Sequence, residues 1–157
     1  MTAQSPQEYF RLLLLTVVGQ AYTAAGYQLQ ERPAQWNGGL FRFSRPLTPP
    51  LTGFIEYQLL AYTDTIWASR NPSRFRVTLT RTDQSTPQLP STHPAFARRD
   101  LSALVVQDFN VAILPSAEYW WTFANTDELG KALAEAGHLV IGFAIPWLAG
   151  DLLPPSA

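Results

Sequence analysis

Cysteine is absent from the 157 residues of this chain, and only two histidines and one lysine are present. Without cysteine the chain forms no disulfide bond and offers no thiolate as a metal ligand or nucleophile. Two histidines without an accompanying cluster of spaced acidic residues do not predict a zinc site. We therefore expect neither a metal nor another cofactor.

Charge is also scarce: 15% of the residues are charged and the formal net charge is -1, which argues against non-specific nucleic-acid binding. The charge that is present is unevenly placed. Residues 70–99 contain six arginines and Asp83, whereas residues 100–157 contain Lys131 and seven acidic residues. These two parts of the chain therefore either attract each other or present faces of opposite sign.

A long hydrophobic run is missing too. Leu12–Gly19 is largely apolar, but Arg11 and Gln20 bracket it, and it is far shorter than the roughly 20 residues that cross a membrane. This short apolar run also resembles the central part of a secretion signal. The preceding Ser5-Pro6-Gln7-Glu8 carries a capping serine, a proline suited to the first helical position and a glutamate that completes a capping box. We therefore favour a helix over residues 6–25 in a cytoplasmic protein with no membrane partner.

Several later segments have the composition of β-strands. Within residues 73–81, Phe75, Val77 and Leu79 alternate with arginine and threonine, which predicts a strand with one face in solvent. Three prolines make residues 82–99 a predicted loop. Strand is favoured over helix for Leu101–Leu114 because it contains several β-branched residues. The predicted strands are residues 27–31, 40–45, 53–62, 73–81 and 101–114.

A second long helix is predicted over residues 127–144, capped by Asn125 or Thr126 and ended by Pro146. Gly130 and Gly137 flank its apolar stripe, which indicates close packing of another segment there. At this length we expect a single domain. The predicted fold is α+β: a mostly antiparallel β-sheet with an N-terminal and a C-terminal helix packed on one face.

Five segments together carry a family resemblance: "AGYQLQERPAQWNGGLFRFSR", "GFIEYQLL", "SRFRVTLTR", "YWWTFANTDELGKAL" and "IPWL". In this order they resemble the uncharacterised bacterial domain-of-unknown-function family numbered 4304, over roughly residues 8–148. The chain departs from that family in its proline-bearing segment 82–99 and in using arginine in place of lysine. The resemblance implies the same fold and a bacterial cytoplasmic setting, and it implies no activity and no site residues.

Arginines supply the stronger functional signal. Arg42, Arg74 and Arg76 alternate with core residues on two predicted strands, so we expect them to line one exposed sheet face. Clustered guanidinium groups bind carboxylates or phosphates through paired hydrogen bonds. The alternative is a solvated face with weak cross-strand ion pairs. Glu56 is either a partner of these arginines or a buried acid able to exchange protons.

Two neighbouring tryptophans, Trp120 and Trp121, precede the second helix. In an extended segment they point to opposite faces, so we expect one in the core and the other covering an edge, a loop or a partner. We expect the loop around Trp36 or the end of the chain to cover the outward-facing tryptophan.

Three functions remain open at this stage. The first is a non-catalytic binding module that takes an acidic protein partner, with Arg42, Glu56, Arg74, Arg76 and the three named tryptophans as binding residues. The second is a subunit or self-assembling protein, because Leu12, Leu15 and Tyr22 lie on a side of the first helix that its core stripe leaves free. The third is a small hydrolase-type enzyme using Glu56. We predict no catalytic residue beyond that alternative.

Overall fold

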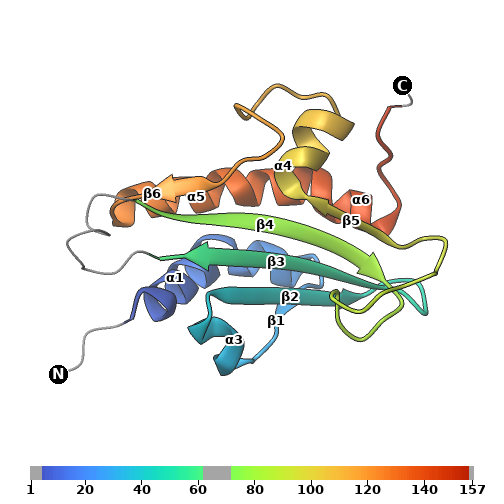
Figure 1. Ribbon diagram of the computed structural model, residues 1–157, viewed down its shortest axis with the longest axis horizontal. Helices are drawn as coiled ribbons and strands as arrows, with labels where there is room; N and C mark the ends of the chain where they lie inside the picture. Colours follow the sequence, from blue (N-terminus) through green and yellow to red (C-terminus); the bar gives the residue numbers. More distant parts are fainter. Residues whose placement is uncertain (1–4, 62–71, 156–157) are drawn as a thin grey trace.

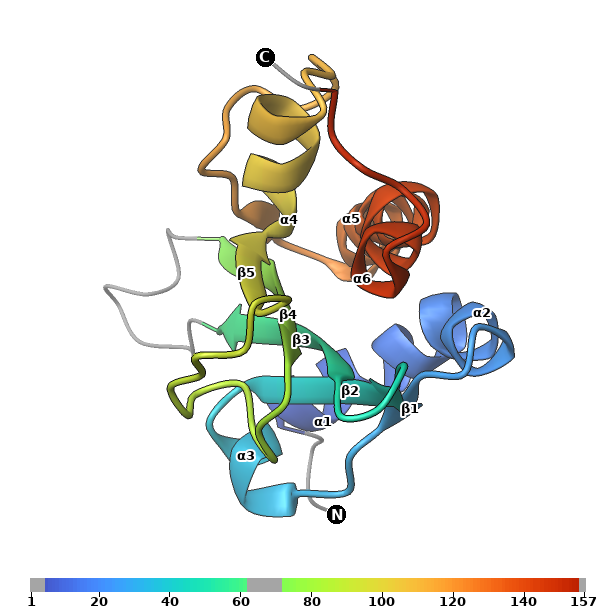
Figure 2. The ribbon, with the colours of Figure 1, turned by 90° about the vertical axis from the view of Figure 1, so that its right-hand side faces the viewer.

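The computed structural model describes residues 5–61 and 72–155. It shows an antiparallel sheet of six strands with two long helices packed on one face (Figures 1 and 2). The sheet order is β1-β2-β3-β4-β5, and β6 pairs with the start of β4. The strands are β1 (Gln28–Leu29), β2 (Leu40–Pro46), β3 (Thr52–Leu60), β4 (Ser73–Thr82), β5 (Ala97–Asp100) and β6 (Trp121–Phe123). The predicted α+β fold is therefore confirmed.

The first long helix comprises α1 (Pro6–Leu14), a π-helical turn (Leu15–Gly19) and α2 (Gln20–Ala24). Its predicted start is confirmed, because the Ser5 hydroxyl accepts a hydrogen bond from the Glu8 backbone N–H at 3.1 Å. Gly26 follows the helix with φ of 90°, a conformation that glycine adopts readily. A short helix, α3 (Pro33–Asn37), then leads into β2.

The last helix comprises α5 (Thr126–Leu139), a π-helical turn (Val140–Ala144) and α6 (Ile145–Ala149). Asn125 caps it by accepting the Glu128 N–H at 2.9 Å. The predicted end at Pro146 is wrong. Pro146 lies in the first turn of α6, directly after the π turn, where a missing N–H is tolerated. The helix ends instead before Gly150, which has φ of 82°.

By length and composition alone, the 24 residues Thr126–Ala149 are apolar enough to cross a membrane. Half of the apolar window is buried inside the fold, as in the core helix of a soluble protein, so the composition is weak evidence for a membrane span.

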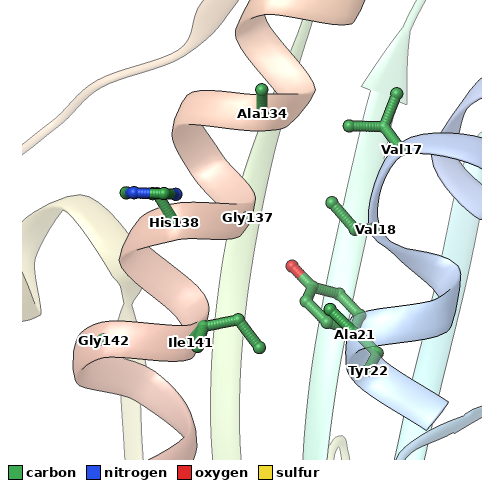
Figure 3. A pocket seen from close by; sticks show the side chains of 9 residues that line it. All are labelled: Val17, Val18, Ala21, Tyr22, Ala134, Gly137, His138, Ile141 and Gly142. Atoms are coloured by element: carbon green, nitrogen blue, oxygen red, sulfur yellow. The ribbon is translucent and has the colours of Figure 1, made fainter. Parts of the chain in front are cut away.

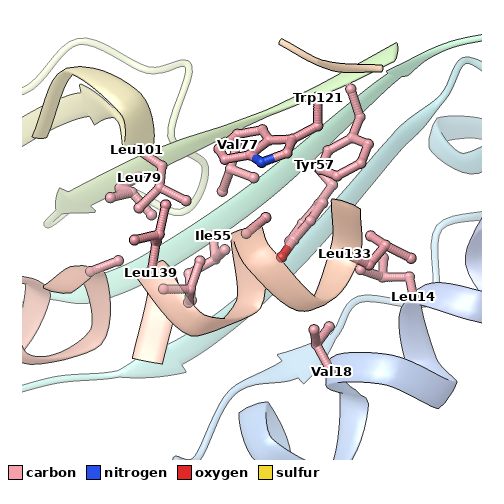
Figure 4. Packing of buried hydrophobic residues seen from close by; sticks show 14 of the residues in the cluster. Leu14, Val18, Ile55, Tyr57, Val77, Leu79, Leu101, Trp121, Leu133 and Leu139 are labelled. Carbon is pink, nitrogen blue, oxygen red and sulfur yellow. The ribbon is translucent and has the colours of Figure 1, made fainter. Parts of the chain in front are cut away.

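Both long helices pack on the same sheet face and share one core (Figure 4). Phe75, Val77 and Leu79 of β4 are buried beneath them, so the predicted alternation of this strand is confirmed. The first helix contributes Phe10, Leu14, Val18 and Tyr22, and the last helix contributes Leu129, Leu133, Ala136 and Val140.

The two long helices are in close contact at Gly137. A Cβ atom added there would lie 2.6 Å from Cγ1 of Val18, so glycine is required for this contact. The prediction of close packing is thus confirmed at Gly137. It is wrong at Gly130, where an added Cβ meets no atom of the described residues within 4 Å.

Two predictions for the middle of the chain need correction. Leu101–Leu114 is not a strand: it begins with α4 (Leu101–Ala103) and a π turn (Leu104–Asp108), and continues as irregular chain. Leu101, Leu104 and Val105 are all buried, a helical spacing, so packing into the core outweighs the strand preference of valine. The predicted loop 82–99 is also shorter than expected, because its end forms part of β5.

Candidate binding surface

The sheet face opposite the helices carries the predicted arginines. The backbone register places Arg42 opposite Glu56, and Gln58 opposite Arg76. Arg74 lies opposite Leu60 on one side and Thr122 on the other. Because alternate residues of a strand point to the same side, the three arginines and Glu56 share this face, as their spacing predicted.

Arg42 and Glu56 form a buried ion pair on this face. The Arg42 Nε donates to Glu56 Oε2 at 3.1 Å, and the two side chains are only 5% and 3% exposed. Gln88 closes a ring with them: its Oε1 accepts from Arg42 Nη2 at 2.8 Å, and its Nε2 donates to Glu56 Oε2 at 3.2 Å. All three groups are therefore hydrogen-bonded to one another.

The prediction that Arg42 lines an exposed surface is therefore wrong. The chain between β4 and β5, residues 83–96, crosses this part of the sheet and brings Gln88 over the ion pair. Pro87 of the same segment is buried. Sequence reasoning missed Gln88, because nothing in a proline-bearing polar loop indicates which of its side chains faces the sheet.

Arg74 and Arg76 lie beyond this cover and contact Trp120. Their guanidinium carbons are 4.5 and 4.9 Å from the centre of the Trp120 ring, within the range of cation–π attraction. Arg76 is exposed, whereas Arg74 and Trp120 are half-buried. We call these three residues the arginine–tryptophan surface.

The neighbouring tryptophan points the other way. Trp121 is buried in the core, stacks on Phe75 with ring centres 5.6 Å apart, and donates its indole N–H to Glu135 at 3.0 Å. The prediction of one tryptophan inside and one outside is therefore confirmed. Arg74 and Arg76 lie over the Trp120 ring, a cover that the sequence did not predict. Trp36 is covered by Arg11, whose guanidinium carbon is 4.4 Å from its ring centre.

Arg74 and Arg76 of the arginine–tryptophan surface form no ion pair within residues 5–61 and 72–155. The ion pairs of those residues are Arg42–Glu56, Arg99–Asp108 and Lys131–Asp127, so Arg74 and Arg76 form none. Within the same ranges, Arg74 Nε is buried and has no hydrogen-bond acceptor. Two neighbouring guanidinium groups, one of them with a buried donor that is unpaired in these ranges, are suited to a carboxylate or phosphate group.

Serine and histidine do not form a nucleophile and base on the 83–96 segment. The Ser91 hydroxyl donates to Asp83, which lowers the pKa of that carboxyl, and His93 Nδ1 accepts the backbone N–H of Ala95 at 3.0 Å. The described part of the chain contains no group of three or more metal-ligating side chains.

The patch predicted on the first helix is only partly exposed. Leu12 and Leu15 are 51% and 38% exposed, but Tyr22 is fully buried, so its place in the patch was wrong. The Tyr22 hydroxyl reaches the sheet and lies 2.5 Å from the Tyr57 hydroxyl. Beside it, an apolar groove of about 420 Å³ runs between the two long helices, with Val17 and Ile141 on opposite sides (Figure 3).

Comparisons of the chain with protein-family models, with curated proteins and with solved structures give no match in any of the three. The resemblance to family 4304 therefore stays a prediction.

Proposed function

We propose that this protein is a non-catalytic binding module whose arginine–tryptophan surface holds an acidic group of a protein partner. The observation that carries the proposal is the pair Arg74 and Arg76, stacked on one indole ring without a carboxylate partner among the described residues. A protein partner is favoured over nucleic acid because the chain as a whole has a net charge of -1.

Stacking on Trp120 prepares the two arginines for binding. A free arginine side chain loses rotamer freedom when it grips a ligand, and this loss reduces affinity. Contact with the indole ring restricts Arg74 and Arg76 before the ligand arrives. The two positive charges also repel each other, and a bound carboxylate would relieve that repulsion. Charge-assisted hydrogen bonds to a carboxylate are among the stronger ones in proteins.

Glu56 gives little support to the alternative of an enzyme. Its carboxylate is 3% exposed and holds hydrogen bonds from both Arg42 and Gln88, so it serves as the internal partner of an arginine. Glu56 is therefore committed to Arg42, and among the described residues no carboxylate forms an ion pair with Arg74 or Arg76.

The test is affinity capture from the native host with the Arg74→Ala/Arg76→Ala variant. We expect the variant to lose one or more partners with acidic segments, by about 3 kcal/mol or roughly a hundredfold in Kd. Arg32→Ala/Arg98→Ala is the matched control, because it removes the same charge from exposed sites. A folded Arg74→Ala/Arg76→Ala variant that keeps every wild-type partner would refute the proposal.

Self-association through the helical layer is the second candidate function. It is favoured by the exposure of Leu12 and Leu15 and by the open groove beside Val17 and Ile141. Light scattering on the wild type and on Leu15→Glu separates the two states: a dimer that dissociates in the variant supports this candidate. A wild-type monomer at all concentrations contradicts it.

A further inference from the structure

The ring formed by Arg42, Glu56 and Gln88 has the geometry of a ligand site. Two charged side chains, both more than nine-tenths buried, hold the two ends of one primary amide. The amide oxygen accepts from Arg42 and the amide nitrogen donates to Glu56. Gln88 itself is exposed, so its side chain enters the site from the surface segment that covers it.

We propose that the Arg42–Glu56 pair is a binding site for a primary carboxamide, filled in cis by Gln88. An asparagine or glutamine side chain of a partner protein would compete with Gln88 for it, and the 83–96 segment would open when that competitor wins. This inference concerns a different site from the arginine–tryptophan surface and stands without it.

Charge explains why a carboxamide is the right chemical class. A carboxylate in the place of Gln88 would meet Arg42 favourably but would lie beside Glu56, a like charge. An ammonium group would be attracted by Glu56 but repelled by the positive charge of Arg42. A primary amide is neutral and presents an acceptor and a donor side by side, which matches one guanidinium N–H and one carboxylate oxygen.

A second buried polar group on the same face supports the inference that the cover over this face is replaceable. The Thr80 hydroxyl is fully buried and has no hydrogen-bond partner in the described ranges. Thr80 lies two residues after Thr78 on β4, and Thr78 pairs with Glu56 in the register of β3 and β4, so all three side chains share one face. A sheet face that is permanently covered would gain stability from an apolar residue there, because a buried unpaired hydroxyl costs free energy.

The experiment uses the full chain, acetamide as the probe and the Arg42 Nε–H signal in ¹H–¹⁵N NMR spectra as the readout. In wild type, Gln88 occupies the site and acetamide should leave this signal unchanged. In Gln88→Ala, acetamide should shift the signal in a saturable manner, and sodium acetate should not. Gln84→Ala is the matched control on the same segment, and it should behave as wild type.

Each outcome decides the inference. An Arg42 signal that ignores acetamide in Gln88→Ala overturns it, and so does an equal response to acetate, which would indicate a general anion site. Gln88→Asn provides a second variant, since its shorter side chain withdraws the amide from the pair. Loss of the folded spectrum in both variants would also overturn the inference, because Gln88 would then be part of the fold and not a replaceable occupant.

Discussion

Gly130 and Gly137 lie on the same helix, seven residues apart, and the same change to alanine is expected to have opposite effects on stability. Alanine is favoured over glycine inside a helix by about 1 kcal/mol. At Gly130 an added methyl group meets no described atom within 4 Å, so Gly130→Ala should raise the free energy of unfolding by about 0.5–1 kcal/mol. Nothing opposes the gain at that site.

At Gly137 the added Cβ would lie 2.6 Å from Val18 Cγ1, closer than two non-bonded carbon atoms can approach. Val18 is stiff because it is β-branched and lies inside a helix, so the two helices must separate slightly. Overpacking of this kind costs about 1–3 kcal/mol and outweighs the helical preference. We expect Gly137→Ala to be less stable than Gly130→Ala by about 1–3 kcal/mol in urea unfolding.

Shortening Val18 tests whether its contact with the added Cβ atom destabilises Gly137→Ala. In the Val18→Ala background the methyl group of Gly137→Ala has room, so the second change should become neutral or stabilising. Equal stabilisation by Gly130→Ala and Gly137→Ala in the wild-type background would refute the close approach of the two helices.

Further predictions concern buried polar groups. Glu56→Ala leaves Arg42 buried without its counter-charge and should cost about 3–5 kcal/mol in urea unfolding, whereas Glu56→Leu with Arg42→Leu should cost far less. Tyr27→Phe should be neutral or stabilising in thermal melts, because the Tyr27 hydroxyl is buried with no partner in the described chain; a loss above about 1 kcal/mol would show a missed hydrogen bond. Burial raises the pKa of Tyr27 to about 12, so the unfolded chain loses this proton first, and the contribution of Tyr27 to stability should fall by about 2 kcal/mol as the pH rises from 10 to 12; the loss of stability over this range should be smaller in Tyr27→Phe.

Local patterns were sufficient to predict most of the fold. The capping residues Ser5 and Asn125 fixed where the long helices begin, and the alternation in β4 identified the face that they cover. These signals lie within a few neighbouring residues and need no knowledge of distant contacts. The strand prediction for residues 101–108 was wrong for the opposite reason. The helix there depends on burial of Leu104 and Val105 against distant parts of the chain.

The candidate site was predicted in part, for the same reason. Strand alternation correctly grouped Arg42, Glu56, Arg74 and Arg76 on one face, because side-chain direction in a strand follows from sequence position. Whether that face is open depends on where the 83–96 segment crosses it, and Gln88 is 46 residues from Arg42 in sequence. No local pattern reports such a contact, so exposure could not be read from the sequence.

The indole N–H signal of Trp120 in ¹H–¹⁵N NMR spectra gives the most direct test of the proposed binding surface. The probe is a hexaglutamate peptide, with hexalysine as the control of opposite charge. We predict that hexaglutamate shifts the Trp120 signal saturably, that added salt weakens the effect, and that the signals of buried Trp121 and Trp147 stay in place. The shift should vanish in Arg74→Ala/Arg76→Ala and weaken in Arg74→Lys/Arg76→Lys, which keeps the charge but loses paired hydrogen bonding. An unmoved Trp120 signal, or a shift that survives Arg74→Ala/Arg76→Ala, would contradict the account.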